Sequence, residues 1–354
     1  MTETAVNDKN DEKAHGTADA YDVVVVGGGA AGLSGALALS RARRSVLVID
    51  SGRPRNAPAE GVHVYLGREN TPPAELMADG REEIRRYGAE IREGEVVAAE
   101  HDDAAARAGS GIGFRVTLAD GTAVRARRLL VTSGLVDELP ELPGLAELWG
   151  TGVLHCPYCH GWEVRDRRIG VLSTGPLAVH QALLWRQWSD DVTLFLHTGP
   201  EPDDESYEQL AARGITVVDG KVDELVRADG RLTGLRLASG RVFDLAALAV
   251  ATRMNARADW LTPLGVELAD QMVQGTMVGR HIPTDPTGRT DVPGVWAAGN
   301  VVEVSSQVIV AAAAGVRAGA ALNADLVSED TRAAVTAHRA AADRELASSS
   351  QVAL

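Results

Sequence analysis

The sequence predicts an α/β protein of two domains, each built on a parallel sheet with covering helices. At roughly 100 to 200 residues per domain, 354 residues suffice for about two domains. Near the N-terminus an apolar strand, a glycine-rich turn and an Ala-rich helix follow one another, and a strand, loop, helix and strand return after residue 168. Units of this kind are Rossmann-like, so we expect two Rossmann-like (three-layer ββα) dinucleotide-binding domains.

The amino-acid composition disfavours nucleic acid and membranes as binding partners. Lys plus Arg number 35 against 49 Asp plus Glu, and the net charge of −14 disfavours a nucleic-acid partner. We find neither an uncharged apolar run of about 18 residues nor an apolar signal region at the N-terminus, so we expect no membrane segment and a cytoplasmic location. Both cysteines of the chain, Cys156 and Cys159, fall within four residues, which chance placement rarely produces.

The first domain is expected to begin after a leader. Residues 1–19 are polar and lack apolar periodicity, which predicts a disordered segment. The apolar run Val23–Val26 predicts a strand buried on both faces. We expect a helix over Leu33–Arg43 and a second strand over Ser45–Ile49, which ends at Asp50.

A long loop rich in Pro, Gly and Asn follows, over Arg53–Pro73, and its length indicates a functional role. Pro73–Tyr87 reads as a helix, and alternation over Phe114–Leu118 and Ala123–Val131 predicts a hairpin. Its second strand ends at the turn Thr132–Gly134.

We expect the chain to pass between the domains twice, through two linker segments that we call crossings. Asp137–Gly150 carries two prolines and two glycines, and Arg253–Asp259 is polar and expected to be irregular. Between them we expect a strand at Arg168–Leu172, a helix at Leu177–Trp188 and a strand at Val192–His197, followed by hairpins up to Val250.

The last ordered block is expected to be a strand and turn over Gly294–Val301 and a helix over Ala311–Leu326, with a helix that frays after Asp330. The predicted domains are therefore 20–137 with 256–330, an inserted 150–250, and a C-terminal helix or tail at 331–354.

The glycine-rich turn fits the pattern G-x-G-x-x-G of dinucleotide-binding loops. Gly27 permits a tight turn, Gly29 lets the backbone approach a pyrophosphate, and Gly32 lets the helix close on the strand. Ala30 and Ala31 lie within the loop, and the N-terminal amides of the following helix are expected to face the anion. Asp50, 23 positions after Gly27, is placed to accept a ribose hydroxyl. A glycine turn without a nucleotide is the alternative.

The corresponding loop of the second unit is degenerate. Ser173 stands where the first glycine is expected, and four acids between Glu201 and Glu205 follow the next strand, where arginines would clamp the 2′-phosphate of NADPH. Because Gly175 and Ala178 remain, binding of a dinucleotide with altered geometry stays open.

Cys156 and Cys159 form a redox-type C-x-x-C pair. His155 and His160 flank it, so a Cys2His2 zinc site is the alternative, but adjacent residues of one short loop wrap a tetrahedral ion poorly and we expect no metal. His160 is the candidate for moving the thiol proton, and a structural role for it stays open.

From residue 20 to about 327 the chain resembles the low-molecular-weight thioredoxin reductase family of flavoproteins. The resemblance rests on the glycine loop with Asp50, the turn at Thr132, the C-x-x-C pair and the segment Thr290–Asn300. It implies FAD, a split FAD domain, an inserted NAD(P)-like domain and a homodimer. The FAD-binding residues it implies are Gly27, Gly29, Ala30, Ala31, Gly32, Asp50, Ser51, Asn56, Val96, Thr132, Ser133, Gly134, Gly299, Asn300, Gln307 and Val308.

Three departures from that family are similar to its dithiol-oxidising branch, which includes the enzymes that close disulfides in holomycin-type and gliotoxin-type natural products. His160 replaces an Asp, Ser173 and acids replace the NADPH-binding residues, and Asn300 replaces an Asp. The resemblance implies oxygen as the redox partner, a small-molecule dithiol as substrate, Cys159 beside the flavin and Cys156 facing the substrate.

By the same resemblance, His160 is expected to deprotonate the substrate thiol. The loop residues His63, Tyr65 and Leu66 are our candidates for part of the pocket. Two alternatives stay open: a thioredoxin-type reductase fed by NAD(P)H or ferredoxin, and a flavin- or nucleotide-binding redox regulator without catalysis.

Overall fold

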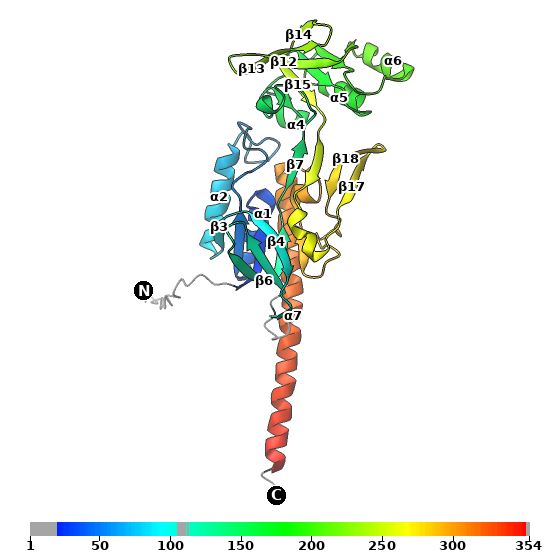
Figure 1. The fold of residues 1–354 in the computed structure, drawn as a ribbon. Coiled ribbons are helices and arrows are strands. Elements are labelled where there is room, and N and C mark those ends of the chain that lie inside the picture. The colour runs from blue at the N-terminus through cyan, green and yellow to red at the C-terminus, as the bar shows by residue number, and fades with distance from the viewer. Residues whose placement is uncertain (1–19, 105–110, 112, 352–354) are drawn as a thin grey trace, which may run out of the picture.

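A computed structural model of the chain describes residues 20–104, 111 and 113–351 (Figure 1). The expected leader 1–19 and the last three residues of the expected tail lie outside the described residues. Two α/β units stack along one axis, and a long helix leaves the first unit on the side opposite the second (Figure 1). The prediction of two Rossmann-like domains is confirmed.

The first domain is a sheet flanked by helices. Its elements are β1 (Ala20–Val26), α1 (Ala30–Arg41), β2 (Val46–Asp50), α2 (Pro73–Arg86), β3 (Glu90–Glu93), β4 (Val96–His101), β5 (Phe114–Leu118), β6 (Ala123–Val131), β19 (Val295–Ala297) and α7 (Val308–Gln351). Strand order is β3-β2-β1-β6-β5-β4, with β19 parallel to the second half of β6. Val23, Val24 and Val25 of β1 are fully buried, which explains their unbroken apolar run.

The second domain carries a five-stranded sheet of order β11-β10-β9-β15-β8, whose pairings are parallel, and a three-stranded antiparallel sheet. Its elements are η1 (Ala146–Leu148), β8 (Val153–Leu154), α4 (Pro157–His160), β9 (Ile169–Leu172), α5 (Ala178–Trp185), β10 (Val192–Phe195), α6 (Asp204–Ala212), β11 (Thr216–Val218), β12 (Val222–Ala228), β13 (Arg231–Leu237), β14 (Val242–Asp244) and β15 (Ala247–Val250).

A mixed four-stranded sheet joins the domains, and here one expectation is wrong. It consists of β7 (Leu135–Glu138), β16 (Arg253–Ala256), β17 (Ala269–Val273) and β18 (Thr276–His281), accompanied by the 3₁₀ turns η2 (Asp259–Leu264) and η3 (Gly299–Val301). The segment expected to be irregular is strand β16, which pairs antiparallel with β7. The two crossings pair with each other, so the polar segment gains its ladder from a partner distant in sequence.

Helix α7 packs on α1 through glycines. A Cβ on Gly315 would lie 2.0 Å from the carbonyl oxygen of Ala31, and one on Gly319 would lie 2.8 Å from that of Gly35. Larger residues at these positions would separate the helices, because real Cβ contacts are wider. This close contact between the two helices holds the start of α7 against α1, the helix that follows the glycine loop.

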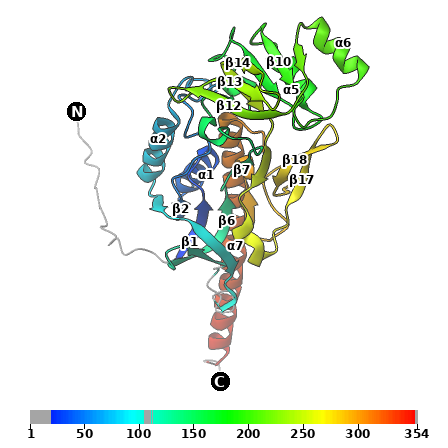
Figure 2. The same ribbon diagram turned by 45° about the horizontal axis from the view of Figure 1, so that its top comes forward.

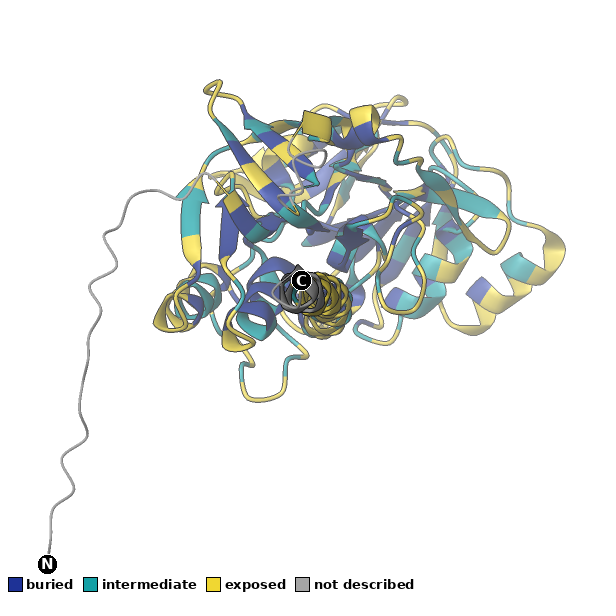
Figure 3. Ribbon diagram, turned by 90° about the horizontal axis from the view of Figure 1, so that it is seen from below, coloured by how far each residue is buried: buried dark blue, intermediate teal, exposed yellow. Residues whose placement is uncertain are grey.

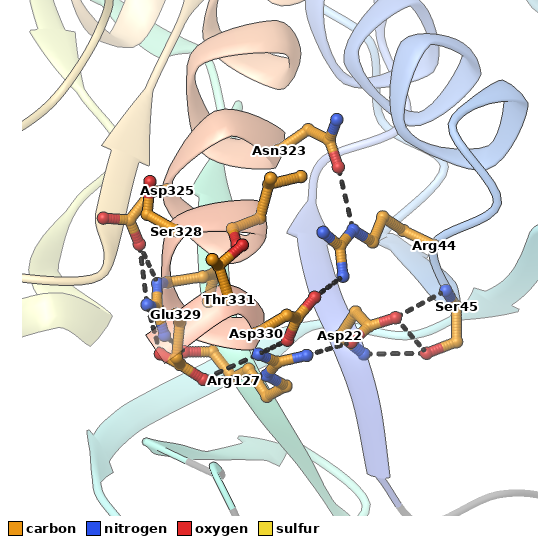
Figure 4. A network of polar contacts seen from close by, with 12 residues as sticks. Asp22, Arg44, Ser45, Arg127, Asn323, Asp325, Ser328, Glu329, Asp330 and Thr331 are labelled. Atoms are coloured by element: carbon orange, nitrogen blue, oxygen red, sulfur yellow. Dashed lines mark hydrogen bonds and ion pairs between the residues drawn. The ribbon is translucent and has the colours of Figure 1, made fainter. Parts of the chain in front are cut away.

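Three arginines tie the middle of α7 to the first domain, and Figure 4 shows two of them, Arg44 and Arg127. Arg127 of β6 contacts Asp22 at 2.8 Å, Glu329 at 2.7 Å and Asp330 at 2.5 Å. Asp330 also lies 2.7 Å from Arg44. Arg128 belongs to the same cluster, because its guanidinium lies 2.5 Å from Glu329. These partly buried pairs hold α7 along the edge of the first domain.

The helix expected after Asp330 is present, and it is one continuous helix with the preceding segment, because α7 runs without a break to Gln351. Residues 331–340 are exposed, and Figure 1 shows the C-terminal part of α7 extending away from the body, while Figure 3 views the helix end-on. Ala and Arg favour helix, so the helix persists without packing.

Against the expectation of no membrane-spanning segment, Val308–Arg344 is long and apolar enough to cross a membrane by length and composition alone. One third of its most apolar stretch is buried in the protein, 33%. Core helices of globular proteins pass the same test.

We expect Arg127→Ala to lower the free energy of unfolding by about 2 kcal/mol, because it leaves partly buried carboxylates without their cation. Denaturant unfolding measures this. Arg332→Ala, on the exposed part of α7, is the control and is expected to change stability by less than about 0.5 kcal/mol. Equal stability of the two variants would contradict the anchoring role of the cluster.

Candidate active site

A cavity of about 2010 Å³ lies where the carboxyl ends of the first-domain strands meet the second domain. Figure 2 shows β1, β2 and β6 pointing toward that domain. Ligand sites commonly occupy about 300 to 1,000 Å³, so this cavity has room for a dinucleotide and a second molecule. Ligands of open α/β sheets bind at this edge of the strands.

The glycine loop is held by contacts that only glycine allows. Gly27 has a φ of +105°, and a Cβ there would lie 2.3 Å from the carbonyl oxygen of Thr132. A Cβ on Gly32 would lie 1.9 Å from the carbonyl oxygen of Gly27. Around Gly29, in contrast, a Cβ would meet nothing within 4 Å. Gly27 and Gly32 therefore serve packing, whereas Gly29 leaves an open cradle at the N-terminus of α1.

Asp50 is engaged within the loop. Its Oδ1 accepts the N–H of Gly28 at 3.1 Å, and its Oδ2 lies 2.5 Å from the guanidinium of Arg81. The ionised carboxylate has about four acceptor positions, which leaves capacity for a ribose hydroxyl. Sequence reasoning missed Arg81, which lines the cavity from α2.

Asn300 has a role that an aspartate would not fill. Its Nδ2 lies 3.3, 3.1 and 3.0 Å from the carbonyl oxygens of Glu303, Val304 and Ser306. A carboxylate accepts hydrogen bonds only, so an Asp here would face three oxygens without a donor. Asn300 thus shapes the turn that leads into α7.

The cavity gathers the candidate residues from distant parts of the chain. Gly32 packs inside the fold, as expected for its role. The remaining FAD candidates line the cavity, namely Gly27, Gly29, Ala30, Ala31, Asp50, Ser51, Asn56, Val96, Thr132, Ser133, Gly134, Gly299, Asn300, Gln307 and Val308. Cys156, Cys159 and His160 line it too. Of the three pocket candidates in the loop, His63 lines it, whereas Leu66 is 93% exposed and Tyr65 does not reach it.

The cysteine pair sits on the short helix α4, with Pro157 at its first turn. A Cβ on Gly161 would lie 2.8 Å from the ring of Trp188, and Tyr158 packs edge-on against the same ring at 5.5 Å. The aromatic contacts hold α4 against the segment after α5, which fixes the pair at the cavity wall.

The two thiols are electrostatically unequal. The hydrogen bond between them lowers the pKa of Cys156 to about 7 and raises the pKa of Cys159. Burial raises both values, and the positive charge of Arg55 lowers both. Cys156 is therefore the group that carries the negative charge in the reduced pair.

His160 is enclosed. Both ring nitrogens are buried without a protein hydrogen-bond partner. Burial lowers the pKa of His160, while the negative charge of Glu163 opposes that shift. A neutral imidazole is a proton acceptor, which suits a base.

His155 also lines the cavity, and its Nδ1 lies 3.2 Å from the carbonyl oxygen of Val250. Within the described part of the chain, no group of three His, Cys, Asp or Glu side chains is arranged to hold a metal ion.

Sequence reasoning missed an ion pair at the crossings. Arg55 contacts Asp137 through two nitrogens at 2.6 and 2.7 Å, and Thr252 donates to the same carboxylate at 2.9 Å. The Asp137 side chain is only 5% exposed. Burial raises its pKa, but the contacts with Arg55 and Thr252 outweigh burial and lower it. Asp137 begins the first crossing and Thr252 immediately precedes the second, so these contacts join the loop to both connections between the domains.

One face of α5 was also missed as a wall of the cavity. The lining residues are Leu177, His180, Gln181, Leu184 and Trp185. These residues recur at i, i+3, i+4, i+7 and i+8, a spacing that places them on one face of a helix and that could have been found in the sequence.

The second nucleotide loop is tightly packed at Ser173, whereas at Gly175 a Cβ would meet nothing within 4 Å. Ser173 is 2% exposed, and its carbonyl oxygen accepts the N–H of Gly199 at 3.0 Å. A Cβ on Gly199 would lie 1.8 Å from Ser173 Oγ. At the following strand end, Asp203 caps α6 through the N–H of Ser206. The acids of this region thus stand where the phosphate of NADPH would need cations.

This fold and site define a flavin-type disulfide oxidoreductase, and the comparisons agree. Residues 21–315 match the pyridine nucleotide-disulphide oxidoreductase family, to which the chain belongs. The crystal structure of HlmI is 46% identical with a TM-score of 0.81 and covers 89% of this chain and 95% of its own. Thioredoxin reductase tcpT of Claviceps purpurea (strain 20.1) is 33% identical over 324 residues, covering 88% and 97%.

Thioredoxin reductase sirT of Leptosphaeria maculans is 30% identical over 327 residues, with 88% of this chain and 96% of its own covered. The cofactor is FAD, as in the thioredoxin reductase-like members of the family. The residues fit it: the cradle at Gly29 is open, and the expected lining surrounds the cavity.

We expect Gly27→Ala to lower stability and Gly29→Ala to weaken FAD binding. Gly27→Ala forces a side chain into the Thr132 carbonyl and should lower the free energy of unfolding by more than about 2 kcal/mol. Gly29→Ala should leave the apoprotein as stable as the wild type but release FAD. The ratio of flavin absorbance to protein concentration measures bound FAD, and denaturation of the apoprotein measures stability. Retention of FAD by Gly29→Ala would contradict the assignment of Gly29 to the FAD-binding cradle.

Reduced protein is expected to show a Cys156 thiolate that forms near pH 7. Cys159→Ala removes the hydrogen bond that stabilises the thiolate, so the pKa rises and alkylation at pH 7 slows about tenfold. The measurement is the pH dependence of iodoacetamide labelling of Cys156. Cys159→Ser keeps a donor and is the control. An unchanged profile in Cys159→Ala would contradict the assignment.

Proposed function

We propose that the chain is an FAD-dependent dithiol oxidase that closes a disulfide in a small-molecule natural-product dithiol, with O2 as acceptor and H2O2 as product. The observation that carries the proposal is the contrast between the two nucleotide loops. The first loop and the cysteine pair line one cavity, whereas the second loop has the buried Ser173 in place of its first glycine and is followed by acids. Electrons therefore enter from the thiols rather than from NADPH.

The residues have separate roles in this reaction. His160 takes the proton of one substrate thiol, and the thiolate attacks the sulfur of Cys156 in the enzyme disulfide. The S–S bond of the enzyme breaks, and Cys159 leaves with the electron pair. The second substrate thiol gives its proton to the Cys159 thiolate, whose pKa is raised, and then attacks the substrate sulfur that is bound to Cys156. The product disulfide forms and Cys156 leaves as a thiolate, for which its lowered pKa of about 7 is suited.

Bound FAD would supply the two-electron oxidation that restores the enzyme disulfide, with O2 as the final acceptor. The balance is one dithiol and one O2 giving one disulfide and one H2O2. The cradle at Gly29, the turn at Thr132 and the Asn300 segment hold the cofactor, and α4 presents the cysteines to it.

A second candidate is a thioredoxin-type reductase fed by NAD(P)H or ferredoxin. The relatives tcpT and sirT carry the name thioredoxin reductase, and Gly175 keeps part of the second loop. The same cysteine pair would then pass electrons outward.

The proposal includes a homodimer in the cytoplasm, without nucleic acid or membrane as a partner. A cytoplasmic location agrees with a substrate that arrives as a dithiol, because cellular thiols are kept reduced there.

The test is anaerobic mixing of the holoprotein with NADPH, NADH and dithiothreitol in turn. We expect the dithiol alone to bleach the oxidised flavin band, and air to restore it with one H2O2 per flavin. Cys156→Ser is expected to abolish bleaching by the dithiol. Bleaching by either nicotinamide within seconds would support the reductase instead.

A further inference from the structure

The loop Arg53–Asn70 of the first domain reaches the second domain and its crossings at three places. Arg55 pairs with Asp137 in the crossing, and a Cβ on Gly150 would lie 2.8 Å from Pro58. The third contact is between His63 and Glu163, which follows α4. Three contacts from one loop hold α4 in a defined position over the cavity.

His63 is fixed between two carboxylates. Its Nδ1 lies 2.7 Å from Glu69 Oε1, and its Nε2 lies 3.6 Å from Glu163 Oε1. The other oxygen of Glu69 accepts the N–H of Val64 at 2.9 Å, so Glu69 is itself anchored. The His63 side chain is 17% exposed and lines the cavity with His160. The ring therefore has one orientation, with an edge toward the segment that carries the cysteines.

Glu163 lies three residues after His160, and the charges of both Glu163 and His63 reach the His160 ring. Both ring nitrogens of His160 are buried without a side-chain partner. The polar groups that act on the ring are Glu163, His63 and the backbone of Cys156. His180 of α5 lines the same cavity.

We propose that His63 and Glu163 are positioning residues for His160: the pair, made between two domains, places and tunes the base that receives the substrate proton. The inference rests on the proposed dithiol oxidation. It assigns to the loop Arg53–Asn70 a part in the proton step, in addition to holding the domains together. The base reaches its working state when the loop is docked on the second domain.

The two neighbours act on His160 in opposite directions, which makes the proposal testable. The negative charge of Glu163 raises the pKa of His160, and the positive charge of His63 lowers it. Glu163→Gln should therefore lower that pKa and move the rising limb of the pH–rate profile to lower pH. His63→Gln should raise it and move the limb to higher pH. We expect each shift to be about half a pH unit, which is a threefold change in rate below the midpoint.

The experiment measures flavin reduction by dithiothreitol against pH in holoproteins of the wild type, Glu163→Gln and His63→Gln. Glu60→Gln alters an exposed carboxylate of the same loop and is the control, with a wild-type profile expected. Opposite shifts of the two variants support the proposal. A uniform loss of rate with an unchanged profile, or shifts in the same direction, overturns it.

A second measurement separates this proposal from the proposed function. The His160 ring is titrated by NMR in 13C-histidine-labelled protein, with its signal assigned by its loss in His160→Gln. If dithiols fail to reduce the wild-type flavin, the oxidase is overturned, while opposite shifts of the His160 titration still support the pairing. Absence of those shifts overturns the pairing whatever the activity.

Discussion

The architecture depends on the close approach of Gly27 to Thr132, where β1 and β6 end side by side. The Thr132 hydroxyl lies 2.9 and 2.8 Å from the carbonyl oxygens of Val26 and Gly27. Backbone so close to backbone requires a residue without Cβ and with positive φ. Because β19 pairs with the same end of β6, this contact also places Gly299 and Asn300 beside the glycine loop. The FAD-binding edge follows from one steric constraint.

The second domain takes its position from polar contacts near the crossings. Antiparallel pairing of β7 with β16 brings the two crossings together, and Asp137 and Thr252 then meet Arg55 of the loop. An ion pair this buried is costly to leave half-formed, so it favours one arrangement of the domains. In that arrangement α4 closes the cavity, and the charge of Arg55 acts on both thiols.

The proposed chemistry depends on the different acidities of the two thiols in the C-x-x-C motif. Cys156 and Cys159 differ by three positions, yet one is the acidic thiol and the other the hydrogen-bond donor. Beside them stands a histidine removed from water, and at the second nucleotide loop stand acids and a buried serine. Each feature suits the electron flow from a dithiol that we propose for this site.

The sequence by itself determined the local units. The valine run of β1, the spacing of Gly27, Gly29 and Gly32, and the C-x-x-C pair encode a strand, a loop and a redox motif from adjacent residues. Only the tertiary structure decided the strand at β16, the pairing of Arg55 with Asp137 and the meeting of His63 with Glu163. These contacts join residues that are far apart in the sequence, 82 positions for Arg55 and Asp137, so neighbouring residues carry no pattern for them. They form because packing brings the charges together and burial then makes their pairing necessary.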